Sequence, residues 1–278
     1  MILALALTFA PQLEKIGVVR FDAVAEMSGI VPSSRYSGTY WVHNDSGDSA
    51  RIFPIRRDGS SAMVKADKKW AGIAIKDARN VDWEDITSDG KNLYISDMGN
   101  NGNERKNLGV YVIEEPNPSA TEVARFKFIP LSYPDQTEFP PKNWDYDCEA
   151  VFWLRNKLYF VTKHRRSKFF PVDSTNLYRL DFVDRKNQLT KIDHADSLGG
   201  WVTGAAVSPD GSTIALLCQA PLQRVWLYST QAKNDKFFAA GGRSIGLSNV
   251  KQAEGICFES NSALIITNEQ REIYRLTL

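Results

Sequence analysis

The feature that most constrains this chain is a short pattern that recurs five times along it. Each copy has a polar residue, then a small residue or aspartate, then an apolar run. The polar residues, which we call the marker residues, are Ser28, Glu84, Glu149, Thr203 and Glu254. They are 56, 65, 54 and 51 residues apart, and the chain ends together supply one further interval of 52. Self-similarity of this length is typical of repeat architectures, and the complementary ends indicate a closed ring of five units.

Each unit also repeats a set of β-strand signals. After the marker come a turn and a second run rich in β-branched and aromatic residues, and a third such run follows a loop. The second strands are expected at 39–44, 93–97, 158–163, 213–219 and 264–268, and the third at 51–59, 109–115, 176–182, 224–230 and 272–278. A fourth strand is expected at 61–67, 124–131, 189–194 and 235–241. The last unit reaches the end of the chain without one, so we expect residues 14–21 to supply it.

These patterns predict an all-β fold, a five-bladed β-propeller of four-stranded antiparallel blades whose last blade is closed by an N-terminal strand. No long helical periodicity competes with this interpretation. The long second interval leaves six blades as the alternative, if it contains an irregular blade. We expect residues 11–278 to form a single propeller domain.

The innermost strands of a propeller line a central channel, so the marker residues should face one another across its axis. Three converging glutamates would repel one another unless protons or a cation relieved them. An all-oxygen ligand set of Ser28, Glu84, Glu149, Thr203 and Glu254 favours Ca²⁺ over other metals. Alternatively, the glutamates accept hydrogen bonds from backbone amides, and water or a monovalent ion fills the channel.

Composition excludes several classes of function. The formal net charge of +1 gives no electrostatic reason to expect a nucleic-acid partner. The three cysteines are far apart and show no CxxC pair, which argues against a zinc ribbon or a disulfide framework. Residues 1–10 are apolar but too short to cross a bilayer. We therefore expect no membrane insertion. We also expect the protein to be a monomer.

Residues 1–10 can be interpreted in two ways. They resemble the apolar region of a secretory signal ending in a small-x-small pattern, although the basic segment is missing. This favours a signal-peptide remnant and a periplasmic or extracellular location. The other interpretation is an apolar tail.

The marker motifs and the strand endings, as in "EGICFESNSALIITNEQREIYRL", resemble the SdiA-regulated and phytase-esterase-like propeller families. The marker order Ser, Glu, Glu, Thr, Glu is also similar to the calcium-activated nucleotidases, or soluble apyrases, whose central calcium is held by Ser, Glu, Glu, Ser, Glu. Ser28, Glu84, Glu149 and Glu254 match that set, and Thr203 departs from it but keeps a hydroxyl. The resemblance implies a propeller with a central calcium, whereas the nucleotidase substrate residues are not matched.

Polar residues follow the second strand of each unit, where the chain returns to the face of the marker residues. Their mixture of acids and bases suits a small-molecule or anionic ligand near a metal. Asp45 and Asp97 are candidate bases, and Lys163 is a candidate catalytic cation. Candidate ligand-binding residues are His43, Asn44, Arg105, Gln219 and Asn268. For each of them the alternative is a residue that fixes its own turn.

Two functions therefore remain open at this stage. The first is a calcium-binding propeller with a structural metal, binding a small or polymeric ligand at the channel mouth. The second is a calcium-dependent hydrolase of nucleotides or phosphate esters. The chain contains no GxSxG, P-loop or HExxH motif, which counts against common hydrolase chemistries without excluding hydrolysis.

Overall fold

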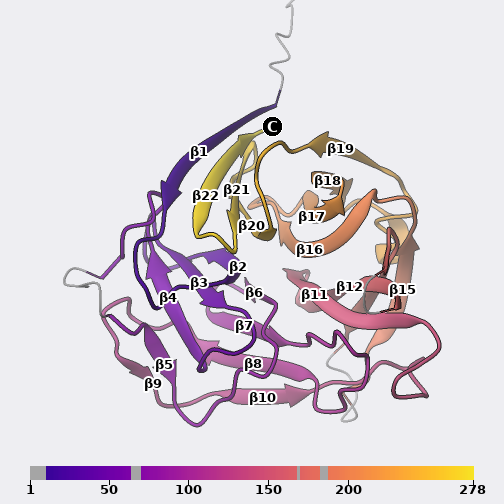
Figure 1. The fold of residues 1–278 in the computed structure, drawn as a ribbon, viewed down its shortest axis with the longest axis horizontal. Helices are drawn as coiled ribbons and strands as arrows, with labels where there is room; N and C mark the ends of the chain where they lie inside the picture. The colour runs from indigo at the N-terminus through magenta and orange to yellow at the C-terminus, as the bar shows by residue number, and fades with distance from the viewer. Residues whose placement is uncertain (1–10, 64–69, 168–169, 182–186) are drawn as a thin grey trace, which may run out of the picture.

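The computed structural model describes all residues except 1–10, 64–69, 168–169 and 182–186. Its strands form five separate sheets arranged around one axis (Figure 1). Helical structure in the described part is confined to one 3₁₀ turn, η1 (Lys233–Asp235). The fold is therefore an all-β, five-bladed β-propeller, as predicted. The apolar segment 1–10, on which the signal-peptide interpretation depends, lies outside the described residues.

Each blade is an antiparallel sheet whose strands run outward from the axis in chain order. Blade 1 contains β2 (Met27–Pro32), β3 (Tyr40–Asn44), β4 (Arg51–Ile55) and β5 (Ile73–Ile75), and β9 (Glu122–Val123) pairs in parallel with β5. Blade 2 contains β6 (Asp85–Ser88), β7 (Asn92–Asp97), β8 (Gly109–Glu114) and β10 (Lys127–Pro130). Blade 3 contains β11 (Trp144–Leu154), β12 (Lys157–Ser167), β14 (Thr175–Leu180) and β15 (Thr190–Ala195), with β13 (Phe170–Val172) paired to β12. Blade 4 contains β16 (Gly200–Val207), β17 (Thr213–Pro221), β18 (Arg224–Ser229) and β19 (Gly242–Gly246).

Blade 5 joins the two ends of the chain. It contains β20 (Ala253–Ser260), β21 (Ala263–Asn268) and β22 (Glu272–Thr277), and its outer strand is β1 (Gln12–Val18). β1 pairs antiparallel with β22, so Gln12 faces Thr277 and Val18 faces Glu272. Lys15 and Glu272 add an ion pair of 2.6 Å across this pairing. Closure by an N-terminal strand is confirmed, and it pairs the outer edge of β22, which would otherwise be open to another chain.

The inner strands β2, β6, β11, β16 and β20 each contact the next around the axis, and β20 returns to β2. Apolar side chains fill the wedges between the blades in five buried clusters, one at each blade interface. Trp41 of blade 1 packs with Leu93 of blade 2, for example, and Phe152 of blade 3 packs with Phe237 of blade 4. Each blade buries both faces against its neighbours. This packing sets the positions of the blades and therefore of the inner strands around the axis.

Two outer strands differ from the sequence prediction. In blade 1 the fourth strand is β5 and not 61–67, of which residues 64–67 lie outside the described part. In blade 4 the fourth strand is β19 and not 235–241. Phe237 and Phe238 are adjacent yet both buried against the interface of blades 3 and 4. Neighbouring side chains on a strand point to opposite faces, so a loop is what lets both rings enter the same cluster.

Candidate metal centre at the channel mouth

The marker residues occupy the same irregular place on each inner strand. The pairing register shifts at Ser28, Glu149, Thr203 and Glu254, so each is an extra residue opposite the second strand of its blade. In blade 2 the Glu84 N–H donates to Ser96 O at 3.0 Å while Asp85 is the residue paired with Ser96. A β-bulge of this kind re-aims a side chain, and here it accounts for one side chain per blade turned to the axis.

Close approach of the inner strands explains why glycine follows the marker in some blades. A Cβ added at Gly204 would lie 2.5 Å from Glu254 O of the next blade. A Cβ at Gly255 would lie 2.6 Å from Ser28 O. Both distances are well inside van der Waals contact, so the glycines let the inner strands of blades 4, 5 and 1 converge.

Asp85, which follows Glu84, ties three blades together at the axis. Its Oδ2 accepts hydrogen bonds from Val151 N of blade 3 at 2.9 Å and from Ala205 N of blade 4 at 3.4 Å. Its Oδ1 accepts one from Ile86 N of its own blade at 2.8 Å. Burial raises the pKa of this carboxyl well above its usual range, although the three N–H groups act in the opposite direction. Asp85 thus satisfies backbone donors that the inner edges of the sheets leave unpaired.

The two hydroxyl markers also link neighbouring blades. Ser28 Oγ donates to Glu84 O, from blade 1 to blade 2. Thr203 Oγ1 donates to Ala253 O at 2.8 Å, from blade 4 to blade 5. Both hydroxyls are buried. Their protons are used for ring closure, while their lone pairs remain available to a cation.

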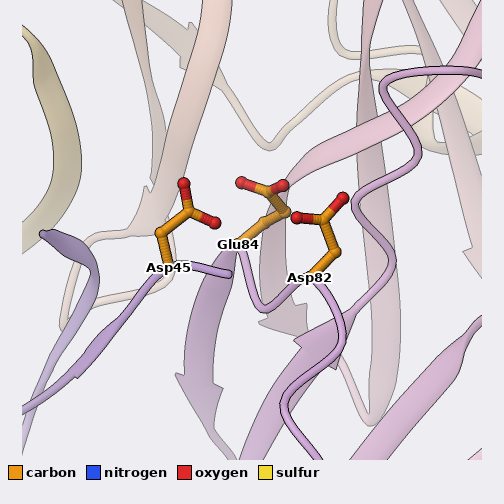
Figure 2. Close-up of side chains that lie close together, drawn as sticks. All are labelled: Asp45, Asp82 and Glu84. Carbon is orange, nitrogen blue, oxygen red and sulfur yellow. The ribbon is translucent and has the colours of Figure 1, made fainter. Parts of the chain in front are cut away.

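The acidic side chains gather at one mouth of the channel, around Glu84. Asp45 follows β3, Asp82 and Glu84 precede β6, and one carboxylate oxygen of each lies within 4.8 Å of the others. Figure 2 shows the carboxyl groups of Asp45 and Asp82 on either side of that of Glu84, all pointing the same way. In a second group, one carboxylate oxygen each of Glu84 and of Asp147 and Glu149 of β11 also lie within 4.8 Å of one another. Glu84 is therefore shared by two triads of carboxylates.

The carboxylate of Glu84 is buried and has no hydrogen-bond or ion-pair partner among the residues that the structure describes. The exposed fraction of Glu84 is 5%. Burial, and then the charge of Glu149, raise the pKa of Glu84 well above its ordinary value. Two carboxylates about 5 Å apart repel by about 3 kcal/mol at the effective dielectric of a protein surface. The arrangement is costly unless a proton or a cation occupies it.

Lys163 supplies one internal cation to the cluster. Its ammonium is ion-paired with Glu149, lies 4.0 Å from Asp147 Oδ2, and is 5.4 Å from the centre of the Trp201 ring. Burial alone would lower the pKa of Lys163, but Glu149 and then Asp147 raise it above the usual value. Its charge is therefore engaged on the blade 3 side of the cluster. It also lowers the pKa of Asp45 and Glu84, but no lysine or arginine of the described residues forms an ion pair with the Asp45–Asp82–Glu84 triad.

Glu254 completes the acidic ring from blade 5. Its Oε1 accepts a hydrogen bond of 2.5 Å from Gln219 Nε2 of blade 4. Burial raises the pKa of Glu254 to about 8, and burial together with Asp147 and Asp45 raises that of Asp82 to about 6. At neutral pH Glu254 therefore largely keeps a proton that a bound cation would displace, whereas Asp82 is mostly ionised.

Several predicted rim residues are engaged in their own loops. Asn44 donates to Ala23 O at 2.8 Å and to Asp48 Oδ2 at 2.7 Å, and Asn268 donates to Val250 O and Glu272. His43 is fully buried, with Nδ1 2.9 Å from Asn44 O, and burial lowers its pKa to about 4. These side chains fix the turns that follow the second strands.

Asp97 and Arg105, predicted separately as a base and an anion-binding residue, pair with each other. Arg105 Nη2 donates to Asp97 Oδ1 at 2.8 Å. Asp97 also accepts the backbone N–H of Asp82 at 3.1 Å. The pair therefore positions the loop that carries Asp82.

Sequence reasoning missed Asp82, Asp85 and Asp147. Asp82 and Asp147 lie two residues before a marker and outside the repeated pattern. Asp85 takes the second position of the pattern, where the other units have a small residue, so a search for equivalent charged positions finds none of the three. Asp147 was the easiest of the three to predict from the sequence, because it precedes Glu149 by two residues and residues two apart on a strand share a face.

The fold and the site define a β-propeller with an acidic channel mouth. No family model and no curated protein matches the chain. Similar solved structures include Kuenenia stuttgartiensis hydrazine synthase, at 12% identity and a TM-score of 0.46, covering 88% of this chain and 70% of the other. A chain of a mitotic checkpoint complex is 10% identical with a TM-score of 0.44, and the match covers 100% of this chain and 99% of the other. U3-55K is 7% identical with a TM-score of 0.44, and the match covers 96% of this chain and 98% of the other. The propeller assignment accordingly rests on the strand pairing, and the resemblance to SdiA-regulated, phytase-esterase-like and apyrase families stays a prediction.

Among the residues that the structure describes, no helix has the length and apolar character needed to cross a membrane.

Replacement of Asp85 tests its role at the axis. D85A leaves three backbone N–H groups without their acceptor, and we expect the free energy of unfolding to fall by about 3 kcal/mol, since each unsatisfied buried donor costs about 1–3 kcal/mol. Urea denaturation measures this, with D22A at an exposed aspartate as the control. A D85A value within error of D22A would contradict the role.

Glu254 should make stability fall as pH rises from 6.5 to 8 in the presence of a chelator. Its pKa is raised from 4.5 to about 8 in the folded state, so the folded chain holds more protons than the unfolded chain, and the free energy of unfolding decreases with pH. The buried His43 and His164 have lowered pKa values, so they act in the opposite direction wherever the unfolded histidines, with a pKa near 6.5, still hold protons, up to about pH 7.5. E254Q should remove about 1 kcal/mol of the fall. Urea denaturation at four pH values measures it, and an unchanged slope would assign the effect to another group.

Proposed function

We propose that this protein is a calcium-binding β-propeller whose ion sits at the acidic channel mouth and stabilises the ring. The observation that carries the proposal is the buried Glu84 carboxylate, which lacks a donor in the described protein and is enclosed by four other carboxylates. An unpaired buried carboxylate needs a compensating positive charge. The Asp45–Asp82–Glu84 triad is the better place for an ion, because Lys163 already serves Glu149.

The ligand set favours Ca²⁺. Every candidate ligand is an oxygen, and the three cysteines are buried in the apolar clusters between the blades. Ca²⁺ binds 6–8 oxygens at about 2.3–2.6 Å, so two of its ligands are at most about 5 Å apart. The 4.8 Å limit within each triad is compatible with that spacing. Waters would complete the shell, since Asp45 and Asp82 are only partly buried.

The marker ring takes part in two ways under this proposal. Glu84 binds the ion directly, and Glu149 and Glu254 add negative charge while they are held by Lys163 and Gln219. Ser28 and Thr203 keep the inner strands in register beneath the ion. The metal would then connect blades 1 and 2, from which Asp45 and Glu84 come. An ion that binds only the closed ring stabilises it by mass action.

Binding is better supported than hydrolysis. The predicted hydrolase would use Asp45 or Asp97 as a base and Lys163 as an anion-binding cation. Asp97 is paired with Arg105, Lys163 is paired with Glu149, and Asp45 belongs to the triad that we assign to the ion. We therefore assign the metal a structural role in a propeller that binds a ligand. A mouth with partly exposed carboxylates suits the millimolar affinities of extracellular calcium modules, in keeping with an exported protein.

Glu84 is the residue with which to test calcium binding. In wild type, Ca²⁺ at 100 times its Kd should raise the free energy of unfolding by about 2.7 kcal/mol relative to chelator. E84Q should abolish this increase, because it removes the shared charge of both triads. Thermal melts and calorimetric titration with Ca²⁺ and Mg²⁺ measure it, and E138Q, at an exposed glutamate, is the matched control.

The proposal is contradicted if wild type shows no heat of binding and no Tm change with millimolar Ca²⁺. It is also contradicted if E84Q responds like E138Q while remaining folded.

Lys163 should act as a competitor of the metal. K163Q removes a positive charge from the cluster, so we expect Ca²⁺ to bind at least tenfold more tightly. Without metal the same change leaves Glu149 buried and unpaired and should destabilise the protein by about 3 kcal/mol. Calorimetric titration and urea denaturation in chelator measure the two effects. An affinity equal to that of wild type would show that the ion lies beyond the influence of Lys163.

A further inference from the structure

A second polar pocket lies on blade 3, beside the acidic mouth. Its volume is about 370 Å³, within the range of small-ligand sites, and β11, β12, β14 and β15 all contribute to it. Asp145, Arg166, Ser174, Asn176, Lys191 and His194 are among the residues that line it. We propose that this pocket binds a small hydroxylated oxyanion, a sugar-sized polyol that carries a carboxylate or a phosphate.

Asn176 gives the strongest indication of a ligand. It is 97% buried (3% exposed), and its Oδ1 is 2.9 Å from Nδ1 of His194, whose Nε2 is 3.0 Å from Asp196 Oδ1. The backbone N–H of Asn176 is also satisfied, by Thr162 Oγ1 at 3.2 Å. Its side-chain NH₂ group has no acceptor among the residues that the structure describes. A buried amide that lines a pocket with both donors unused is suited to an oxyanion.

Ser174 provides a second donor through its contact with His164. The Thr162 hydroxyl already accepts the Asn176 N–H, and the only acceptor near its own proton, in the described part of the chain, is His164 Nε2 at 2.9 Å. The other ring nitrogen, Nδ1, therefore carries the proton and donates to Ser174 Oγ at 2.8 Å. Burial lowers the pKa of His164 to about 3, which keeps the ring neutral. Ser174 thus keeps its own O–H for the pocket, and His164 orients it as a donor without activating it as a nucleophile.

The rim of the pocket is positively charged. Arg166 is exposed and makes no ion pair or hydrogen bond with a described residue. Lys191 makes one loose ion pair, 3.4 Å to Asp135, and lies 5.8 Å from the centre of the Tyr178 ring, and both side chains of the ion pair are substantially exposed. A guanidinium and an ammonium above two neutral donors form a typical oxyanion site.

Asp145 explains why the ligand should also carry a hydroxyl group. Its carboxylate lines the same pocket, 3.7 Å from His164 Nδ1. Burial raises the pKa of Asp145, while Lys191 and His194 lower it. An acceptor beside the donors can bind the hydroxyl of a polyol, whereas it would repel a simple inorganic anion.

The pocket is separate from the proposed metal centre. On β12, Lys163 reaches the acid cluster, whereas His164 and Arg166 line the pocket, as expected from the alternation of side chains along a strand. Arg165 borders the pocket and also pairs with Asp147 at 3.4 Å. Arg166 and Lys191 form no ion pair with the acid cluster in the described part of the chain, so variants at these two positions test the pocket without removing a partner of the metal centre.

Calorimetric titration of the full chain with glucuronate, glucose 6-phosphate, inorganic phosphate and glucose tests the proposal. We expect at least one of the two sugar acids to bind, with glucose and inorganic phosphate at least tenfold weaker. R166A and K191A should each weaken that binding at least tenfold, whereas R125A and K127A, at exposed cations of blade 2, should not. N176D keeps the shape of the side chain but replaces its donors with acceptors, so it should abolish binding while the Tm is retained.

The proposal is overturned if neither sugar acid binds, if glucose binds as well as they do, or if K127A and R125A lose as much affinity as K191A and R166A. Repeating the titration in chelator and with E84Q separates this site from calcium. Unchanged affinity supports the pocket, and binding that disappears with the metal would place the anion at the channel mouth and overturn the assignment.

Discussion

The ring depends on how the inner edges of five sheets meet around one axis. Backbone groups on those edges face the channel and need partners. Asp85 supplies them for blades 2, 3 and 4, and the hydroxyls of Ser28 and Thr203 supply them between blades 1 and 2 and between blades 4 and 5. The outer strands have no such requirement, and they are short or irregular in several blades.

The same geometry concentrates charge at one mouth. Bulges that turn one side chain per blade to the axis place Glu84, Glu149 and Glu254 together, and the loops before β6 and after β3 add Asp82 and Asp45. Within the described residues, Lys163 pairs with Glu149 and Gln219 donates to Glu254, and these contacts offset only part of the repulsion. A propeller that used its channel only for packing would have little reason to leave Glu84 buried and without a donor.

The ring was predictable from the sequence because its signals are local and repeated: a marker, a hairpin and a third strand in each unit. Two of the five outer strands were not, since β5 has only three residues, and Phe237 and Phe238 look like part of a strand until their shared burial is seen. Within the site, the convergence of the markers followed from symmetry. Asp82, Asp85 and Asp147 break that symmetry, and the pairing of Asp97 with Arg105 depends on loop conformation, so both required the three-dimensional structure.

The pairing of β1 with β22 has a mechanical consequence. Because Gln12 faces Thr277, the two ends of the fold emerge side by side (Figure 1). A force that pulls these ends apart would break the hydrogen bonds between β1 and β22 one after another, as in unzipping, and would not shear them all at once. The propeller should therefore resist tension across its blades far better than tension applied through its own termini, and a short peptide could join those termini without distorting the ring.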